Sequence, residues 1–336
     1  MANITIKDIA KEAGVSKATV SRVLNKPHIV EPETRTRVEN VIKKRHYSPS
    51  ATARNLSRRT SDTIGFVVPE VDNPFFGDIL RAVANAIEDF QLTLICCNTD
   101  DSMEKDLKAL VMLKEQRVRG LLYTPAVDYC SKEEREHLTK ILSEMETPVV
   151  IMDRHVDIGD FDGVYFDDYQ GMFNATKELI NQGHTKIAII NATLERVLAR
   201  TRRDGYIDAL KASNIQPEER YNFEGDYGMT KAYELSKKLF DMEDRPTAVI
   251  TCNNRTTLGF IKALRERKEK VPEDIVYVGL DRIEELDVMG YKMNYIERDG
   301  KIMGQKAYEL LARRIKCYDE PVQEVILETK LHLHYI

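Results

Sequence analysis

The chain has 336 residues, of which 42% are hydrophobic, so it can bury the cores of two or three domains. Its formal net charge of -5 is unevenly distributed, because residues 1–60 hold 13 Lys and Arg against 5 Asp and Glu, whereas the remainder holds 37 against 50. The basic head indicates a polyanionic partner, and no run approaches the roughly 18 apolar residues of a membrane helix.

The start of the chain carries the pattern of three short helices. The segment "TIKDIAKEAG" has apolar residues at helical spacing and stops at Gly14, which suits the left-handed conformation that ends a helix. Ser16 can cap a second helix from Lys17, and a third is expected over 32–45, with Pro32 in its first turn. Two short helices around a tight turn predict a helix-turn-helix, whose second helix enters the DNA major groove.

The rest of the chain predicts an α/β body. The segment "YSPSATARNLSRRTSD" has the composition of a linker, and from Ile64 onward apolar runs of strand length alternate with amphipathic helices. The runs are "IGFVVP", "LTLICC", "GLLYTP", "VVIMD", "GVYFD", "KIAII", "AVITC" and "IVYVGLD". Helices are expected near 77–90, 103–116, 131–144, 169–182, 203–213, 229–242, 255–268 and 300–316.

Continuous Val, Ile and Leu strands separated by helices predict parallel sheets that are covered on both faces. Eight such strands can form one large sheet or two doubly wound subdomains. We favour two subdomains, with a ligand crevice at the carboxyl ends of the strands.

Several segments together resemble the lactose-repressor/galactose-repressor family of bacterial transcription regulators. They are "TIKDIAKEAGVSKATVSRVLN", "YSPSATARNLS", "VDNPFF", "CNTDDSMEKD", "GHTKIAII" and "VPEDIVYVGLD", and they occur in the family's order over nearly the whole chain. The resemblance implies a homodimeric repressor that binds a pseudo-palindromic DNA operator. It also implies a body like that of the periplasmic binding proteins, in which a small-molecule effector enters the cleft and changes operator affinity.

By this resemblance the domains are a helix-turn-helix over 1–48, a hinge helix over 49–60 and a body over 61–336. We expect an N-subdomain over 61–161 and 291–320, and a C-subdomain over 162–290 and 321–336.

The resemblance assigns DNA contacts in the head and the linker. Lys17, Ala18 and Arg22 match the positions that read base edges, and Arg22 can present two donors to guanine. Leu56 matches a wedge that enters the minor groove when the hinge folds on DNA. The remaining expected DNA contacts are Thr5, Ser16, Thr19, Ser21, Asn25 and Ala53.

The resemblance also carries over an effector site, whose residues lie at strand ends and helix starts. Tyr227 matches an aromatic stacking position and Arg202 matches the family's effector-binding arginine. The other expected effector contacts are Phe75, Phe76, Asp167, Arg196, Asn254, Asp281 and Arg298.

Two of these positions depart from the family pattern. Asn254, followed by Arg255, stands where relatives have Asp, and Arg298 stands where they often have Gln. We therefore expect an effector that is a sugar or, because a negative charge is lost and cations are added, an anionic derivative such as a sugar acid or a sugar phosphate. Drift at a position that tolerates Asn is the alternative.

Other classes of protein are less well supported. The chain has no Walker loop, no GxGxxG after a strand, no HExxH and no GxSxG, so we expect no enzyme. A solute-binding protein is the main rival, but the basic head and the charged start of the chain argue against it. Five cysteines without metal-ligand spacing indicate reduced thiols in the cytoplasm, and we expect no metal and no cofactor. The sequence leaves open whether a phosphorylated carrier protein acts as corepressor.

Overall fold

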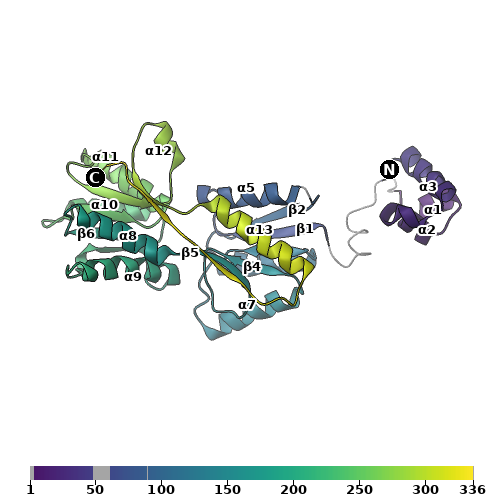
Figure 1. Ribbon diagram of the computed structural model, residues 1–336, viewed down its shortest axis with the longest axis horizontal. Coiled ribbons are helices and arrows are strands. Elements are labelled where there is room, and N and C mark those ends of the chain that lie inside the picture. The colour runs from purple at the N-terminus through teal and green to yellow at the C-terminus, as the bar shows by residue number, and fades with distance from the viewer. Residues whose placement is uncertain (1–3, 48–60, 89, 336) are drawn as a thin grey trace. The chain divides into compact units, whose positions relative to one another are not determined.

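The computed structural model describes residues 4–47, 61–88 and 90–335, and the chain divides into a head, Met1–Ser61, and a body, Asp62–Ile336 (Figure 1). The expected DNA contacts Ala53 and Leu56, with the rest of the hinge over 49–60, lie outside the described residues. Within the described ranges, no helix is both long enough and apolar enough to cross a membrane.

The head is a three-helix unit, as the sequence predicts. Gly14, with φ at +65°, ends the first helix, and the Ser16 hydroxyl accepts a hydrogen bond of 3.1 Å from the Thr19 amide at the start of the second. The helices are α1 (Ile6–Ala13), α2 (Lys17–Asn25) and α3 (Pro32–Arg45), with a 3-10 turn η1 (Pro27–Ile29). Their small core consists of Ile9, Ala10, Ala13, Val20, Val23 and Val38.

The body contains two six-stranded sheets, one in each subdomain. The N-subdomain sheet is parallel in all its described pairings, and the C-subdomain sheet is parallel except for its antiparallel edge strand β12. The N-subdomain order is β11 (Glu324–Leu327), β5 (Asp162–Phe166), β4 (Val149–Met152), β3 (Gly120–Tyr123), β1 (Thr63–Val68) and β2 (Thr93–Asn98). The C-subdomain order is β12 (Lys330–His332), β10 (Asn294–Glu297), β9 (Val276–Leu280), β8 (Ala248–Thr251), β6 (Ile187–Ala192) and β7 (Asn222–Gly225).

Helices cover both faces of each sheet, so the apolar runs are buried as parallel strands require. Figure 1 shows α5 and α13 side by side over the N-subdomain sheet. The N-subdomain helices are α5 (Pro74–Glu88), α6 (Met103–Glu115), α7 (Lys132–Glu144) and α13 (Gly300–Lys316). The C-subdomain helices are α8 (Asp168–Asn181), α9 (Val197–Ala212), η2 (Glu219–Tyr221), α10 (Met229–Phe240), α11 (Asn254–Arg267) and α12 (Glu284–Val288).

The subdomain boundaries differ from the expected ones. Strand β5 pairs with β4, so 162–166 belongs to the N-subdomain, and β11 joins it there. Strand β10 pairs with β9, so 294–297 belongs to the C-subdomain. The chain therefore crosses between the subdomains after β5, after β10 and after β11. The predicted boundaries were wrong because they placed each crossing before the strand that leads into it.

Each of the eight predicted apolar runs forms a strand, and the four further strands β7, β10, β11 and β12 lie outside those runs. They have three or four residues each and all contain polar or charged residues, so none is a continuous apolar run. Helix α9 begins at Val197, six residues before the expected start at 203, because an aspartate from the other subdomain binds its first amide, as described below.

Asp162, at the start of β5, anchors the C-terminal part of the chain to the N-subdomain. Its side chain is fully buried and accepts a bidentate pair of hydrogen bonds, of 2.8 and 2.9 Å, from Arg314 of α13. Arg313 adds a bond of 3.0 Å, and the amide of Gln323, just before β11, adds one of 2.8 Å. One carboxylate therefore joins β5, α13 and the segment that leads into β11.

Replacing this carboxylate should destabilise the body, because it leaves two guanidinium groups without their buried partner. We expect Asp162→Ala to lower the free energy of unfolding by about 3–5 kcal/mol in urea titrations of the full chain followed by circular dichroism. Arg119→Ala is the control, since its pair with Asp62 is long, at 3.8 Å, and exposed, and it should cost less than about 1 kcal/mol. Equal losses for the two variants would contradict the anchoring role of Asp162.

Candidate functional site

The exposed face of α2 carries two cations that pair with no carboxylate among the described residues. Lys17 and Arg22 are both exposed, as is Ala18 between them. Two of the head's acids bind cations away from α2: Glu12 binds Lys44 and Arg45, and Glu39 binds Arg35. Helix α2 therefore presents charged donors to a partner outside the head.

Hydroxyl groups border this face. At the start of α1 the Asp8 carboxylate accepts hydrogen bonds from the Thr5 amide, at 2.9 Å, and the Thr5 hydroxyl, at 2.7 Å, and the Ser16 hydroxyl caps α2. Thr19 and Ser21 are half-buried. Helix starts with exposed amides and hydroxyls suit phosphate oxygens. The side chain of Asn25 lies outside the described residues.

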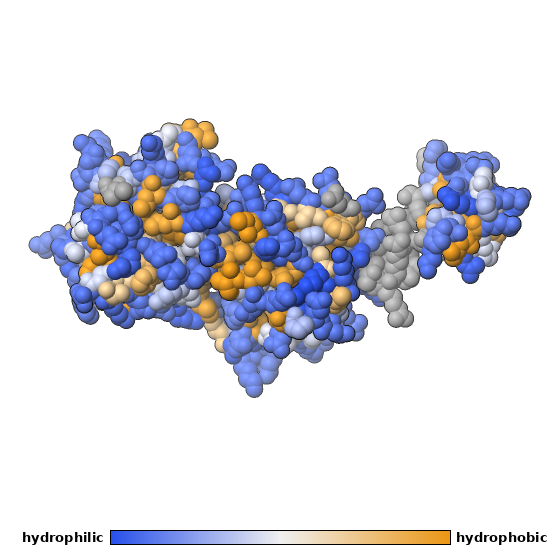
Figure 2. Space-filling model, in the orientation of Figure 1, coloured by the Kyte–Doolittle hydropathy of each residue, from blue (hydrophilic) through white to orange (hydrophobic). Residues whose placement is uncertain are grey.

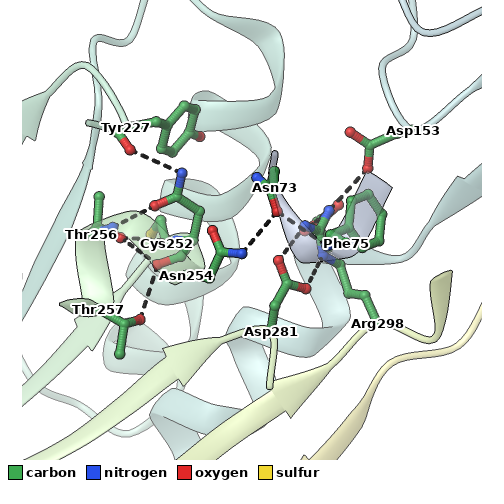
Figure 3. A network of polar contacts seen from close by, with 12 residues as sticks. Asn73, Phe75, Asp153, Tyr227, Cys252, Asn254, Thr256, Thr257, Asp281 and Arg298 are labelled. Atoms are coloured by element: carbon green, nitrogen blue, oxygen red, sulfur yellow. Dashed lines mark hydrogen bonds and ion pairs between the residues drawn. The ribbon is translucent and has the colours of Figure 1, made fainter. Parts of the chain in front are cut away.

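In the body, the carboxyl ends of the strands bring buried charges together (Figure 3). Arg298, on the crossing after β10, donates 2.8 and 2.7 Å to the two oxygens of Asp281 and 3.0 Å to Asp153. Its guanidinium carbon lies 4.2 Å from the centre of the Phe75 ring. All three charged side chains are at most 7% exposed.

A second buried arginine lies in the C-subdomain. Arg202 of α9 donates 2.9 Å to Asp168 and 2.8 Å to the carbonyl oxygen of Cys252. Its guanidinium lies 5.5 Å from the centre of the Tyr227 ring, whose hydroxyl donates 3.1 Å to Asn191. The remaining nitrogen, Nη2 of Arg202, is buried and has no hydrogen-bond partner among the described residues.

Asn254, at the start of α11, reaches the opposite subdomain. Its amide donates 2.8 Å to the side-chain oxygen of Asn73, which precedes α5. Its own oxygen, Oδ1, is buried without a partner in the described part of the chain. The neighbouring Arg255 turns toward the outer edge of the cleft, where it binds Asp72 at 2.9 Å and Glu70 at 3.3 Å.

Further polar contacts connect the two subdomains at the start of α9. Arg196 donates 3.1 Å to Asp101 of the N-subdomain, and the Val197 amide donates 3.2 Å to Asp128. Helix α9 has no cap from its own Arg196 side chain, so Asp128 supplies one from the other subdomain. A cavity of about 410 Å³ opens here, lined by Asp128 and Arg196 among others.

A second cavity, of about 320 Å³, opens at the other edge, beside Phe75, Asp281 and Arg298. Arg202 and Asn254, only 2% and 4% exposed, line neither cavity. The interior of the cleft is thus filled by the chain's own polar side chains.

The structure gives different positions to two expected effector residues. Asp167 caps α8 by accepting 2.9 Å from the Gln170 amide, and its neighbour Asp168 is the residue that turns inward to Arg202. Phe76 packs in the apolar core under the sheet, whereas Phe75 faces the Arg298 guanidinium. One residue along a helix turns the side chain by about 100°, so adjacent residues cannot both face the cleft.

Sequence reasoning missed Asn73, Asp153 and Asp168, all of which are buried and polar. Asp153 is the last residue of the predicted run "VVIMD", so its position at a strand end was an available signal. Asp153 and Asp281 both have positive φ, at 62° and 71°, which only the coordinates reveal. These backbone angles are uncommon for residues with a side chain and often mark functional sites.

The charges of the cleft nearly balance one another. Burial alone would lower the pKa of Arg298, but the carboxylates of Asp281, Asp168 and Asp153 outweigh it and raise that pKa, so Arg298 stays charged. The cluster contains two arginines and three aspartates, and burial raises the pKa of Asp153, which favours its neutral form and brings the cluster closer to charge balance. Burial also raises the pKa of Tyr227 to about 12, so its hydroxyl keeps the proton that it donates to Asn191.

Two of the cations behind the expected anionic effector have carboxylate partners in the structure. Arg298 is occupied by Asp281 and Asp153, and Arg255 is occupied by Glu70 and Asp72. Position 254 carries no carboxylate, but the carboxylates that pair with Arg298 and Arg255 lie nearby, and the sequence pattern did not reveal these pairs.

Two family descriptions match the chain. "Bacterial regulatory proteins, lacI family" matches residues 5–50, and "Periplasmic binding proteins and sugar binding domain of LacI family" matches residues 61–334. The chain belongs to the LacI family. The match in the head argues against the rival class of solute-binding protein, because both halves of a LacI-family regulator are present.

Relatives of known function agree with this assignment. The chain is 36% identical over 329 residues to the HTH-type transcriptional repressor PurR of Mannheimia succiniciproducens, covering 97% of this chain and 96% of the relative. It is also 36% identical over 312 residues to the PurR of Aliivibrio salmonicida, covering 93% and 92%. The protein is a LacI-family DNA-binding transcriptional repressor with an effector-binding body.

Solved structures share the fold. A transcriptional regulator CelR–cellobiose complex is 27% identical, covers 98% of both chains and has a TM-score of 0.72. The Lac repressor dimer bound to operator and the anti-inducer ONPF is 24% identical, covers 98% of both chains and has a TM-score of 0.83. The two-subdomain α/β body and the helix-turn-helix head expected from the sequence are therefore confirmed.

The neighbours Asp167 and Asp168 offer a matched test of the cleft geometry. We expect Asp168→Asn to lower the free energy of unfolding by about 3 kcal/mol, because it leaves the buried Arg202 without a countercharge. Asp167→Asn should change it by less than about 0.5 kcal/mol, since Asn also caps helices well. Urea unfolding of both variants, followed by tyrosine fluorescence, measures the difference. A larger loss for Asp167→Asn would show that the wrong carboxylate had been assigned to Arg202.

Proposed function

We propose that this LacI-family repressor reads a pseudo-palindromic operator as a homodimer, with Lys17 and Arg22 of α2 contacting base edges and hydroxyls of α1 and α2 contacting phosphates. The observation that carries the proposal is the exposed pair of cations on α2 that no described carboxylate neutralises. Ala18 adds only a methyl contact. Ala53 and Leu56 of the linker belong to the same proposed interface, Leu56 as a minor-groove wedge.

A dimer follows from the size of the head. One short helix in one major groove buries too little surface for selective binding, so two heads about one helical turn apart are needed. Apolar residues gather near the middle of the visible face of the body, amid a mostly hydrophilic surface (Figure 2). An exposed apolar area supports a body–body interface. The proposed place of action is the cytoplasm, where the operator is.

For the effector we propose an uncharged compound that offers a hydroxyl or lactam group. Nη2 of Arg202 lacks an acceptor and Oδ1 of Asn254 lacks a donor, and both are buried in the cleft. A hydroxyl both accepts and donates, so the hydroxyl groups of an effector can supply an acceptor for the first atom and a donor for the second. The surrounding arginines are already paired with aspartates, so the cluster has no unpaired positive charge to offset a buried anion.

The DNA-binding proposal is tested with one arginine. Arg22→Ala should weaken binding to the operator by about 1–3 kcal/mol and relax the preference at one base pair in each half-site, because a bidentate contact to guanine is lost. Binding is measured by fluorescence anisotropy at fixed salt, with the operator first located by footprinting of genomic fragments. Arg35→Ala, which removes a cation that is paired with Glu39 on α3, is the control. Equal weakening on random DNA would assign Arg22 to phosphate contact instead.

The effector proposal is tested by calorimetric titration of the full chain with neutral sugars, sugar acids, sugar phosphates and free nucleobases. We expect a neutral compound to bind most tightly. An analogue lacking the group that meets Arg202 and Asn254 should bind about ten- to a hundredfold more weakly, because buried polar atoms are then left unpaired. Tightest binding by an acid or a phosphate would contradict the proposal and restore the anionic effector that the sequence suggested.

A further inference from the structure

The guanidinium of Arg298 is bound as a ligand would be. Two of its nitrogens hold both oxygens of Asp281, a third holds Asp153, and the Phe75 ring covers its face at 4.2 Å. The ring of Phe166, the last residue of β5, lies with its centre 5.8 Å from the same guanidinium carbon. Paired carboxylates and stacked aromatic rings are the contacts with which proteins recognise small polar molecules. In this chain, a side chain of the protein occupies them.

These contacts come from both subdomains. Asp153 follows β4 of the N-subdomain and Asp281 follows β9 of the C-subdomain. Arg298 itself lies on one of the three crossings, between β10 and α13. A single guanidinium therefore ties the two halves of the body together at the hinge.

The backbone supports the same interpretation. Asp153 and Asp281 both adopt the left-handed region, which costs a residue with a Cβ roughly 1 kcal/mol or more. Such a conformation persists where surrounding contacts over-determine it. The shared partner of these two residues is Arg298, so the bond that joins the subdomains also holds both turns in place.

We infer that Arg298 is a built-in ligand of the cleft, which holds the two subdomains closed without an effector and with which an effector must compete. The inference rests on the proposal above that this cleft is the effector site. The other side-chain contacts across the cleft are neutral or more exposed. Asn254 to Asn73 is a neutral hydrogen bond, the Arg196 and Asp101 side chains are 29% and 24% exposed, and the Asp72 side chain bound to Arg255 is 75% exposed.

The structure provides a reporter of closure. The Val197 amide at the start of α9 donates to Asp128 across the cleft, 3.2 Å away, and neither residue contacts Arg298. When the subdomains separate, this amide loses its acceptor and exchanges with solvent. Its hydrogen-exchange rate therefore measures opening at a distance from the substituted residue.

The experiment compares Arg298→Ala with the unsubstituted protein, as full chains without DNA or added small molecules. We expect exchange at Val197, followed by NMR, to accelerate about tenfold or more, the scale on which removing one partner of a buried ion pair shifts an equilibrium. Millimolar methylguanidinium should restore slow exchange in the variant, because it can enter the space between Asp153, Asp281 and Phe75. Sodium chloride at the same ionic strength should not.

Arg245→Ala is the matched control. Arg245 also makes a bidentate pair, of 2.8 and 2.8 Å with Glu269, but both residues belong to the C-subdomain. This variant should leave exchange at Val197 within about twofold of the unsubstituted protein. If Arg298→Ala does not fold, Asp153→Ala replaces it, since that change cuts the tie to the N-subdomain and leaves Arg298 paired with Asp281.

Unchanged exchange at Val197 in Arg298→Ala, or in Asp153→Ala where that variant replaces it, would overturn the inference. The inference would also be overturned if exchange accelerated in Arg298→Ala and methylguanidinium did not slow it, because Arg298 would then stabilise the fold in general and would not occupy a ligand site. Failure of the effector proposal looks different: Val197 would respond to Arg298→Ala and methylguanidinium as expected, while no neutral compound bound the unsubstituted chain in calorimetry.

Discussion

Burying a guanidinium requires a carboxylate beside it, and this requirement organises the body of the protein. Arg298, Arg202 and Arg314 are each buried, and each meets an aspartate at or near one end of a strand. An unpaired charge at any of these places would cost several kcal/mol. The ion pairs therefore fix which strand ends and helix starts must meet, whereas apolar packing fills the faces of each sheet.

The three crossings decide where the pairs can form. Because the strands on either side of the cleft end at its edges, their terminal residues converge there from distant parts of the sequence, as in other open α/β proteins. Asp153 and Arg298 are 145 residues apart and lie within 3.0 Å. Because these residues converge at the cleft, Arg298 can occupy the carboxylates of Asp153 and Asp281 that would otherwise face a ligand.

Much of this architecture could be predicted from the sequence, but the pairings could not. The apolar runs predicted eight strands because buried parallel strands are continuously hydrophobic. Strands β7 and β10 were not predicted because each has four residues and contains both polar and apolar side chains. Resemblance placed Arg202, Tyr227 and Asp281 at the cleft. It could not distinguish Asp167 from Asp168, because either side chain at a helix start can turn inward. It also could not show that Arg298 has carboxylate partners, because those partners follow two different strands.

The head and the body differ greatly in the size of their cores. In the described part of the head the core consists of six buried apolar side chains, whereas the body contains four larger clusters. A domain of about 45 residues with so small a core is only marginally stable by itself. On heating, the head should therefore melt first, as a separate cooperative unit, while the body remains folded. A ligand stabilises only the unit that binds it: DNA raises the lower melting temperature and an effector raises the upper one.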